Sequence, residues 1–304
     1  EFLNRYWPVL AQLGANAENY LYSDPNACIY KLGMFAERLV QEILVFEHMD
    51  EPKIDNTHAN RIRLLKRAGL LPHEIDNTLY ILRKTRNSAV HAGTDSVDEA
   101  KTLLSMTYNL AVWFMETYGD WGFIAGDFVM PEEVHQADLK SVIENQEKKI
   151  AELSKKLAQV TTAVSGTTQK ERAKRAETVS SMMQWNEAQT RCLIDEQLRK
   201  AGWEADTTNL RYSKGTRPVK GRNIAISEWP TNSAFYKNGY ADYAFFIGEK
   251  LVALMDAKKA SEDVASTIDV QVKDYAKHIK EEHAGYVIGS WGDYQVPFLF
   301  ASNG

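Results

Sequence analysis

The chain has 304 residues and a mass of 34.5 kDa, enough for two domains that each bury an apolar core. Its 44% hydrophobic and 25% charged residues exclude a disordered or fibrous chain, and its formal charge of −5 argues against general affinity for nucleic acid. Cys28 and Cys192 are too far apart for a zinc motif or a disulfide framework, and no apolar run approaches the roughly 20 residues that span a bilayer. We therefore expect a globular, cytoplasmic protein that does not contact a membrane.

Residues 1–130 have the apolar spacing of a helical bundle. Apolar side chains recur at steps of three and four residues, as in Phe35, Leu39, Ile43 and Phe46 and later in Leu103, Met106, Leu110 and Phe114. Gly, Pro, Asn and Asp gather near residues 23–26, 51–52, 71–72 and 92–95, where such residues interrupt helices. This pattern predicts four or five helices.

Residues 131–180 are predicted to form a long coiled-coil-like helix and a linker. A heptad seam runs through Leu139, Ile143, Gln146, Ile150, Leu153, Leu157 and Val160, with charged and amide residues between them. It covers about three heptads, so an intramolecular antiparallel arm and a dimer zipper both remain open. Residues 161–169 are small and polar, which indicates a linker.

Residues 181–304 alternate between helix and strand patterns. An amphipathic helix over residues 185–202 precedes β-prone runs at 224–229, 240–247, 251–255, 286–288 and 296–300, with a helix at 265–280 between them. This order predicts an α/β domain with a mixed central sheet flanked by helices. The predicted fold class of the chain is therefore α plus α/β.

A cluster of cations lies in a loop of this second domain. Residues 211–222 contain Arg211, Lys214, Arg217, Lys220 and Arg222 and no acid. Such a loop can contact phosphate, and Lys214, Arg217, Lys220 and Arg222 are the predicted DNA-binding residues. A solvated loop without a ligand fits the charge pattern equally well.

Two strands of this domain carry the candidate catalytic residues. The runs 240–247 and 251–258 predict a β-hairpin, and a three-residue loop at 248–250 would set Ile247 opposite Leu251 and Asp242 opposite Asp256. Lys258 shares the face of Asp256. Two carboxylates can hold Mg²⁺ by oxygen, and an adjacent ammonium can orient or help deprotonate water and offset charge on a phosphoryl group. The alternative is a structural Asp–Lys ion pair at the rim of the hairpin.

Three more residues extend this candidate site. Gln271 and Tyr275 are spaced i,i+4 on one face of the predicted helix, where they could touch the scissile strand or Lys258. Glu187 begins the preceding helix and could supply a third carboxylate to the metal. A solvated helix acid is an equally good interpretation of Glu187.

Residues 187–304 resemble the nuclease domain of the restriction (R, or HsdR) subunit of type I restriction-modification enzymes, which has a PD-(D/E)xK fold. The resemblance is carried by short segments in the same order: Thr190-Arg191, Gly215-Thr216-Arg217-Pro218, Glu228-Trp229-Pro230-Thr231, Ala241-Asp242-Tyr243, Asp256-Ala257-Lys258, Gln271 with Tyr275, and Val296-Pro297-Phe298. One departure is Asp256, where the family more often has glutamate, which shortens the reach of the carboxylate.

The resemblance implies a Mg²⁺-dependent endonuclease that cuts double-stranded DNA together with methyltransferase and specificity subunits. In that family an ATP-driven DNA-translocating motor follows the nuclease, so ATP would bind outside the present chain. The chain begins at Glu1 without a methionine and stops at Gly304 just after a strand-like run, so we expect it to be a piece of a longer protein.

The N-terminal bundle is similar to HEPN-type helical domains through Arg86-Asn87-Ser88-Ala89-Val90-His91, an R-x4-H motif. In catalytic members the matching arginine and histidine cleave RNA without metal, and a guanidinium with an imidazole is chemically sufficient for this. The motif can also be structural, since Asn87 and His91 are spaced i,i+4. A third possibility is a non-enzymatic docking module for other subunits.

Overall fold

The structure is a computed structural model, and it describes residues 2–52, 55–92, 96–133, 167–183, 185–232, 239–259, 264 and 272–304, without the side chains of residues 90–92. The chain forms two compact units, Glu1–Met183 and Gln184–Gly304. The predicted heptad seam and all but the end of the predicted linker lie outside the described residues. No helix of the described part is both long and apolar enough to cross a bilayer.

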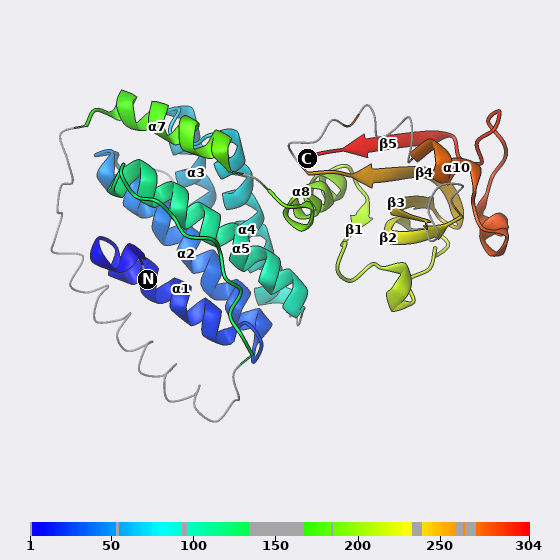
Figure 1. Ribbon diagram of the computed structural model, residues 1–304, viewed down its shortest axis with the longest axis horizontal. Coiled ribbons are helices and arrows are strands. Elements are labelled where there is room, and N and C mark those ends of the chain that lie inside the picture. Colours follow the sequence, from blue (N-terminus) through cyan, green and yellow to red (C-terminus); the bar gives the residue numbers. More distant parts are fainter. Residues whose placement is uncertain are drawn as a thin grey trace. The chain divides into compact units, whose positions relative to one another are not determined.

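The first unit is a helical bundle, as predicted. Its elements are η1 (Phe2–Arg5), α1 (Pro8–Tyr20), α2 (Pro25–Phe46), α3 (His58–Arg67), α4 (His73–Ala92), α5 (Val97–Phe114), η2 (Met115–Gly119) and α7 (Gln169–Met182). Helix α2 packs against α1, α3, α4 and α5 and is central to the unit (Figure 1). Phe35, Leu39 and Ile43 on α2 are buried, so the predicted apolar face is confirmed there.

The helix starts follow from local capping. Asp24 precedes α2, and its side chain accepts a 2.8 Å hydrogen bond from the backbone N–H of Ala27, while Pro25 occupies the first helical position. Ser96 caps α5 in the same way through Glu99 N–H. Thr168 and Glu171 form a reciprocal capping box at the start of α7.

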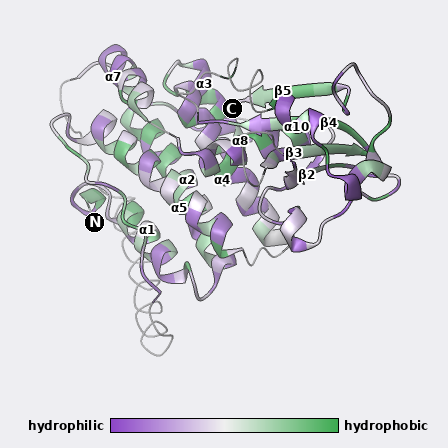
Figure 2. Ribbon diagram, turned by 45° about the vertical axis from the view of Figure 1, so that its right-hand side comes forward, coloured by the Kyte–Doolittle hydropathy of each residue, from purple (hydrophilic) through white to green (hydrophobic). Residues whose placement is uncertain are grey.

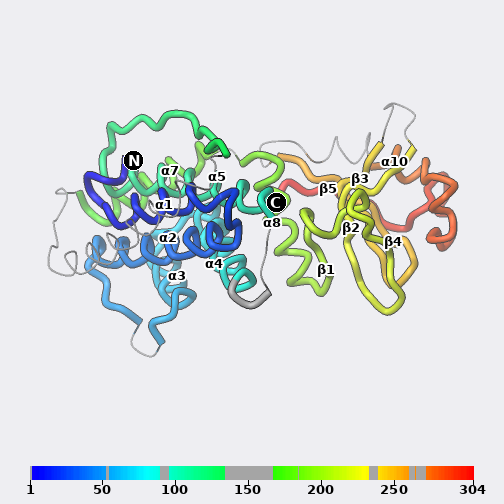
Figure 3. Tube along the Cα trace, turned by 90° about the horizontal axis from the view of Figure 1, so that it is seen from below, coloured from blue at the N-terminus to red at the C-terminus, as the bar shows by residue number. Residues whose placement is uncertain are grey.

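The second unit is a mixed five-stranded sheet with helices, which confirms the predicted fold class for the described residues. It contains α8 (Glu187–Lys200), β1 (Glu204–Ala205), η3 (Tyr212–Lys214), β2 (Asn223–Thr231), β3 (Gly239–Ile247), β4 (Lys250–Ala257), α10 (Lys273–Lys277), η5 (Glu281–Tyr286) and β5 (Phe298–Ser302). The strand order is β1-β2-β3-β4-β5. Strands β2, β3 and β4 are antiparallel, whereas β1 and β5 run parallel to their neighbours (Figure 3).

Two predicted elements of this unit differ from the structure. Residues 286–288, predicted as a strand, instead follow the 3-10 helix η5 and make a single β-bridge from Val287 to Leu251. His283 is buried against Trp229 and Tyr212, so aromatic packing fixes this segment rather than a strand ladder. The predicted helix at 265–280 is described only at its end, where α10 stops at Lys277.

Each face of the sheet has its own core. The face toward α8 buries Ile194 of that helix with Tyr243, Phe245 and Met255. The opposite cluster contains Ile224, Ile226, Trp229, Ala241, Ala244, Phe246, Leu254 and Tyr275, among others. Both faces of β3 and β4 are thus apolar over much of their length, and Figure 2 shows hydrophobic colouring in the sheet.

The β3–β4 hairpin reaches the predicted pairing by a different route. Its loop has two residues, because Ile247 pairs with Lys250 and Phe246 with Leu251, and Gly248 adopts a left-handed φ of 60°. A bulge then places the extra residue Val252 in β4, so that Phe245 pairs with Ala253 and Tyr243 with Met255. The predicted three-residue loop was wrong, but the bulge restores the missing residue and sets Asp242 in line with Asp256.

Candidate active site

The candidate site is centred on a break in the pleat of β2 and β3. Ser227 pairs with Tyr243 and Trp229 with Ala241, but Glu228 and Asp242 between them form no ladder pair. Glu228 has a φ of 52°, a left-handed conformation that costs a residue other than glycine about 1–3 kcal/mol. The face alternation of both strands reverses here, since Trp229 and Ala241 join the cluster that Ile226 and Ala244 also face. The carboxylates of Glu228 and Asp242 therefore lie at this break, on neighbouring strands.

The hairpin brings Asp242, Asp256 and Lys258 together. The backbone N–H of Ala257, between the last two, donates a 2.7 Å hydrogen bond to Oδ2 of Asp242. The Asp242 carboxyl also lies close enough to Asp256 for the charge of Asp256 to raise the pKa of Asp242. Lys258 Nζ lies 2.7 Å from Oδ2 of Asp256, and Asp256 is only 4% exposed. The three residues predicted to form the catalytic core therefore share one site.

Helix α8 supplies two further charges to this site. Glu187 lies in its first turn and Arg191 one turn later, so both project from one side of the helix. Arg191 Nη2 contacts Oδ1 of Asp242 and lies 2.5 Å from Oε1 of Glu187, and Nη1 is 3.7 Å from Oε1 of Glu228. The sequence placed Glu187 here, but it assigned no role to Arg191 or Glu228, although both occur in segments that carry the family resemblance.

The pKa values of Asp242 and Lys258 are shifted by burial and by the neighbouring charges. Burial raises the pKa of Asp242, Arg191 opposes the rise, and the nearby Asp256 adds to it. Burial alone would lower the pKa of Lys258, but the hydrogen bond and charge of Asp256 outweigh it, and the pKa of Lys258 is raised. Lys258 is therefore a cation in this arrangement, suited to orienting an oxygen ligand or offsetting negative charge.

A buried polar network fixes α8 against β3. Asp195 of α8 accepts hydrogen bonds from the N–H of Thr207 at 2.7 Å and from its hydroxyl at 2.9 Å, and the Tyr243 hydroxyl donates to the same carboxylate at 2.9 Å. The Tyr243 hydroxyl also lies 3.3 Å from the backbone oxygen of Arg191. This network sets the position of Arg191 relative to Asp242, and the spacing of the sequence gave no indication of it.

Gln271 and Tyr275, the other two predicted site residues, are not seen beside Asp242 and Asp256 in the described part of the structure. Gln271 lies outside the described residues. Tyr275 is on α10 and is buried in the apolar cluster of the sheet. Its side chain is therefore part of the core in this structure.

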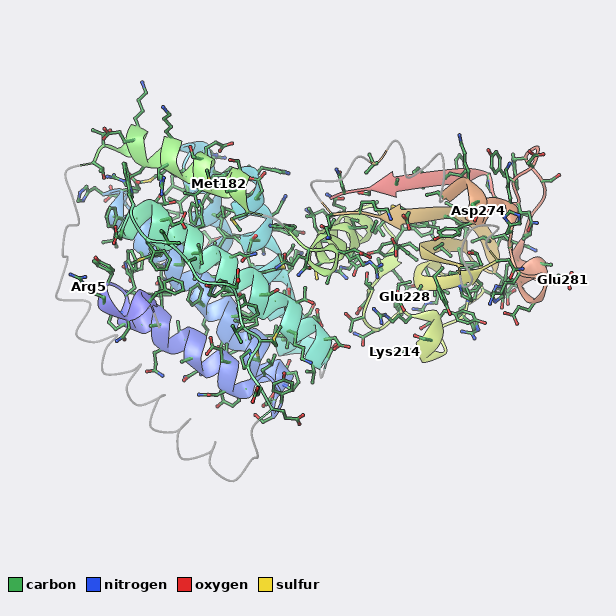
Figure 4. The ribbon with its side chains drawn as sticks, viewed as in Figure 1. Arg5, Met182, Lys214, Glu228, Asp274 and Glu281 are labelled. Carbon is green, nitrogen blue, oxygen red and sulfur yellow. The ribbon has the colours of Figure 1, made fainter. Side chains whose placement is uncertain are left out.

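The cationic loop is partly neutralised by local contacts. Arg211 Nη2 lies 3.1 Å from Glu228, and Arg222 forms an ion pair with Glu204. Arg217 stacks on the Tyr212 ring, with 3.6 Å from its guanidinium carbon to the ring centroid. Lys214 and Lys220 are exposed, and Figure 4 shows Lys214 on η3 and Glu228 on β2 of the same unit.

Arg86 in the helical unit has structural partners. Its Nη1 lies 2.5 Å from Oε2 of Glu37, and its guanidinium lies over the Tyr30 ring. A Cβ atom at Gly33 would overlap the Arg86 side chain, so the glycine allows the arginine to cross α2 closely. The side chain of His91 lies outside the described residues, so an Arg86–His91 pair stays a prediction.

The donor set of the candidate site suits a hard divalent cation. Asp242 and Asp256 both bring carboxylates to the site, and the pKa of Asp242 is raised mainly by burial and further by the charge of Asp256, which a bound cation would offset. Within the described ranges no three His, Cys, Asp or Glu side chains are grouped to hold a metal ion. Two carboxylates fit a metal such as Mg²⁺, which keeps water or phosphate as its remaining ligands.

Comparisons with known proteins agree with this picture. Residues 204–304 match the family described as type I restriction enzyme EcoKI endonuclease subunit second domain, and residues 15–160 match a domain of unknown function (DUF4145). The type I restriction enzyme EcoKI endonuclease subunit of Escherichia coli strain K12 is 28% identical over 381 aligned residues, covering all of this chain and 32% of that subunit. The chain thus spans about a third of the length of this relative. No solved structure matches the chain. The predicted resemblance is confirmed: the chain is similar to an N-terminal part of the endonuclease (R) subunit of type I restriction enzymes.

Proposed function

We propose that this chain is the DNA endonuclease part of a type I restriction enzyme and hydrolyses phosphodiester bonds of foreign double-stranded DNA with Mg²⁺. The observation that carries the proposal is the convergence of Asp242, Asp256 and Lys258 at the hairpin, supported by the matching endonuclease family over residues 204–304. A structural ion pair alone does not explain why two carboxylates share a buried position at a break in the sheet. The site of action is the cytoplasm.

Each residue has a distinct part in this proposal. Asp242 and Asp256 hold the cation, which when bound polarises a phosphoryl oxygen and lowers the pKa of water. Lys258, kept protonated by Asp256, positions the attacking water and offsets charge that develops on the phosphate. Gln271 is proposed to place the substrate strand, and Glu187 to add a carboxylate at the edge of the site.

The rest of the reaction depends on other parts of the enzyme. We propose that an ATP-driven translocase in the remainder of the protein delivers DNA, and that methyltransferase and specificity subunits of the same system supply target recognition. Lys214, Arg217, Lys220 and Arg222 would contact the DNA backbone near the nuclease, because phosphate contacts position a duplex without reading its sequence.

The test is Lys258→Ala in the full-length subunit assembled with its partners. We expect double-strand cleavage to fall by about 10²–10³-fold, because one preorganised positive group is lost, while ATP hydrolysis and the circular dichroism spectrum stay unchanged. Lys259→Ala, which removes the neighbouring exposed lysine, is the matched control and should cleave normally. Normal cleavage by a folded Lys258→Ala enzyme would refute the proposal.

Metal removal separates this proposal from the RNase alternative. EDTA should abolish DNA cleavage, whereas RNA cleavage through Arg86 and His91 would need no metal and would survive both EDTA and Lys258→Ala. Degradation of RNA that persists under EDTA and is lost in Arg86→Ala would assign the second activity to the helical unit.

A further inference from the structure

Arg191 contacts the candidate metal site, but not all of its N–H donors have hydrogen-bond partners in the part of the chain that the structure describes. One terminal nitrogen, Nη2, contacts Asp242 and Glu187 together, while Nη1 is 3.7 Å from Glu228, beyond hydrogen-bonding distance. The Nε atom is buried and has no hydrogen-bond partner among the described residues. A buried guanidinium normally satisfies its donors, so this arginine has donor capacity left over.

Arg191 occupies the oxygen of Asp242 that a metal ion would use. Oδ2 of Asp242 accepts the N–H of Ala257, so Oδ1 is the less constrained oxygen, and Arg191 contacts this one. Asp256 is meanwhile paired with Lys258. Each carboxylate of the pair therefore has its own cationic partner in this structure.

Arg191 also has acceptors to which it can move. Glu187 remains within reach on the same helix, and Glu228 lies beside Asp242, held by its left-handed backbone and by Arg211 at 3.1 Å. A shift of the guanidinium of about 1 Å toward Glu228 would bring Nη1 into hydrogen-bonding range. Arg191 can thus release Asp242 without leaving a buried charge unpaired, which would otherwise cost several kcal/mol.

We propose that Arg191 is a built-in counter-cation that holds Asp242 in the metal-free site and is displaced toward Glu228 and Glu187 when a divalent cation binds. This inference rests on the proposed function, because it assumes that Asp242 and Asp256 bind a metal. Arg191 is a positioning residue whose effect is exerted through Asp242. Its contact with Asp242 competes with metal binding and keeps the acidic pair ordered until the cation arrives.

The test measures Mn²⁺ binding by electron paramagnetic resonance in the full-length subunit without nucleotide at pH 8. Binding that is lost in Asp242→Asn/Asp256→Asn defines the site. Arg191→Ala should bind Mn²⁺ at this site roughly tenfold more tightly, because the metal no longer displaces a charged partner worth about 1 kcal/mol or more. Arg191→Lys should give a smaller change, since one ammonium cannot bridge Glu187 and Asp242 as a planar fork does.

Thermal stability supplies a second readout. Without divalent cations Arg191→Ala should melt below the wild type, and Ca²⁺ should raise its melting temperature by more than it raises that of the wild type. Arg199→Ala is the matched control on the same helix, because Arg199 pairs with Glu196 and has no described contact with Asp242 or Glu228, and its Mn²⁺ affinity should stay at the wild-type level.

The outcomes separate the two proposals. Equal or weaker Mn²⁺ binding by Arg191→Ala, with an unchanged Ca²⁺ effect on melting, would overturn the role of Arg191 and leave a structural arginine. Should Arg191→Ala fail to fold, Arg191→Lys decides by the same measurements. Absence of any Mn²⁺ site that depends on Asp242 and Asp256 in the wild type would instead refute the proposed function itself.

Discussion

Arg172 in the helical unit and Arg191 in the sheet unit are both largely buried arginines with carboxylate partners, and they are bound in opposite ways. Arg172 forms a bidentate pair with Glu47, with nitrogen–oxygen distances of 2.8 and 2.7 Å, and its remaining nitrogen donates to Thr167 O at 2.5 Å. Arg191 shares one nitrogen between two acids and leaves its buried Nε without a partner in the described part of the chain.

This difference in hydrogen bonding indicates that Arg172 is structural, whereas Arg191 is suited to a change of partner. A bidentate pair in which every guanidinium nitrogen has a partner resists rearrangement, and Arg172 accordingly fastens α7 to the end of α2. Around Arg191 the four acids outnumber the three cations, and this excess of acidic groups favours a further cation. The acids are Glu187, Glu228, Asp242 and Asp256, and the cations are Arg191, Arg211 and Lys258.

The Arg172–Glu47 ion pair can be broken by Arg172→Met, which leaves the fully buried Glu47 carboxylate without its partner. We expect the opening free energy of α7 to fall by about 3–5 kcal/mol, and the double variant Glu47→Leu/Arg172→Met to recover most of this loss. Hydrogen–deuterium exchange over residues 169–182 measures it. Arg175→Ala on the same helix, whose arginine contacts the backbone oxygens of Glu116 and Trp121 and lies over the Trp121 ring, should cost about 1 kcal/mol or less. Unchanged exchange in Arg172→Met would show that α7 is held otherwise.

The two units should also respond to acid in opposite directions. Burial lowers the pKa of His58 to about 4, and neither ring nitrogen has a hydrogen-bond partner among the described residues. The folded helical unit therefore binds fewer protons than the unfolded chain, and its free energy of unfolding should decline by up to about 3 kcal/mol as pH falls from about 6.5 to 4. His58→Phe should remove this part of the pH dependence in urea unfolding at pH 4.5 and 7.

In the sheet unit burial raises the pKa of Asp195 to about 6, although Thr207 and Tyr243 donate hydrogen bonds to it. Here the folded state holds the proton more tightly than the unfolded chain, so this contribution to stability is present below about pH 4 and is lost as pH rises through about 6. Asp195→Asn should flatten that slope, which is opposite in sign to that of His58. Slopes of the same sign for the two variants would contradict the contrast.

The smallest expected effect concerns the cationic loop. Lys214 and Lys220 are exposed without an ion pair in the described residues, whereas Arg222 is paired with Glu204. Lys214→Ala/Lys220→Ala should weaken duplex binding several-fold and lower the salt slope of affinity by about 2, as expected for two lost phosphate contacts. Arg222→Ala should have less effect, because its guanidinium already has an acidic partner. Fluorescence anisotropy at several salt concentrations would show whether the three cations contribute alike.

The sequence predicted what depends on periodicity and residue type. The apolar face of α2, the mixed sheet and the meeting of Asp242, Asp256 and Lys258 all follow from spacing. It did not predict Arg191 and Glu228 as members of the site. Arg191 is placed there by the Asp195–Thr207–Tyr243 network between a helix and a strand, and Glu228 by a left-handed backbone that residue type does not reveal.

The short hairpin loop and the bulge at Val252 act as a compensating pair. Deleting Val252 alone would advance β4 by one position along β3 and turn Asp256 and Lys258 to the opposite side of the sheet, although every catalytic residue would still be present. Restoring one residue to the loop would bring them back into phase. Changes in length between the two aspartates are therefore tolerated only in matched combinations, and the thirteen-residue spacing reflects the sum of two irregularities rather than a regular ladder.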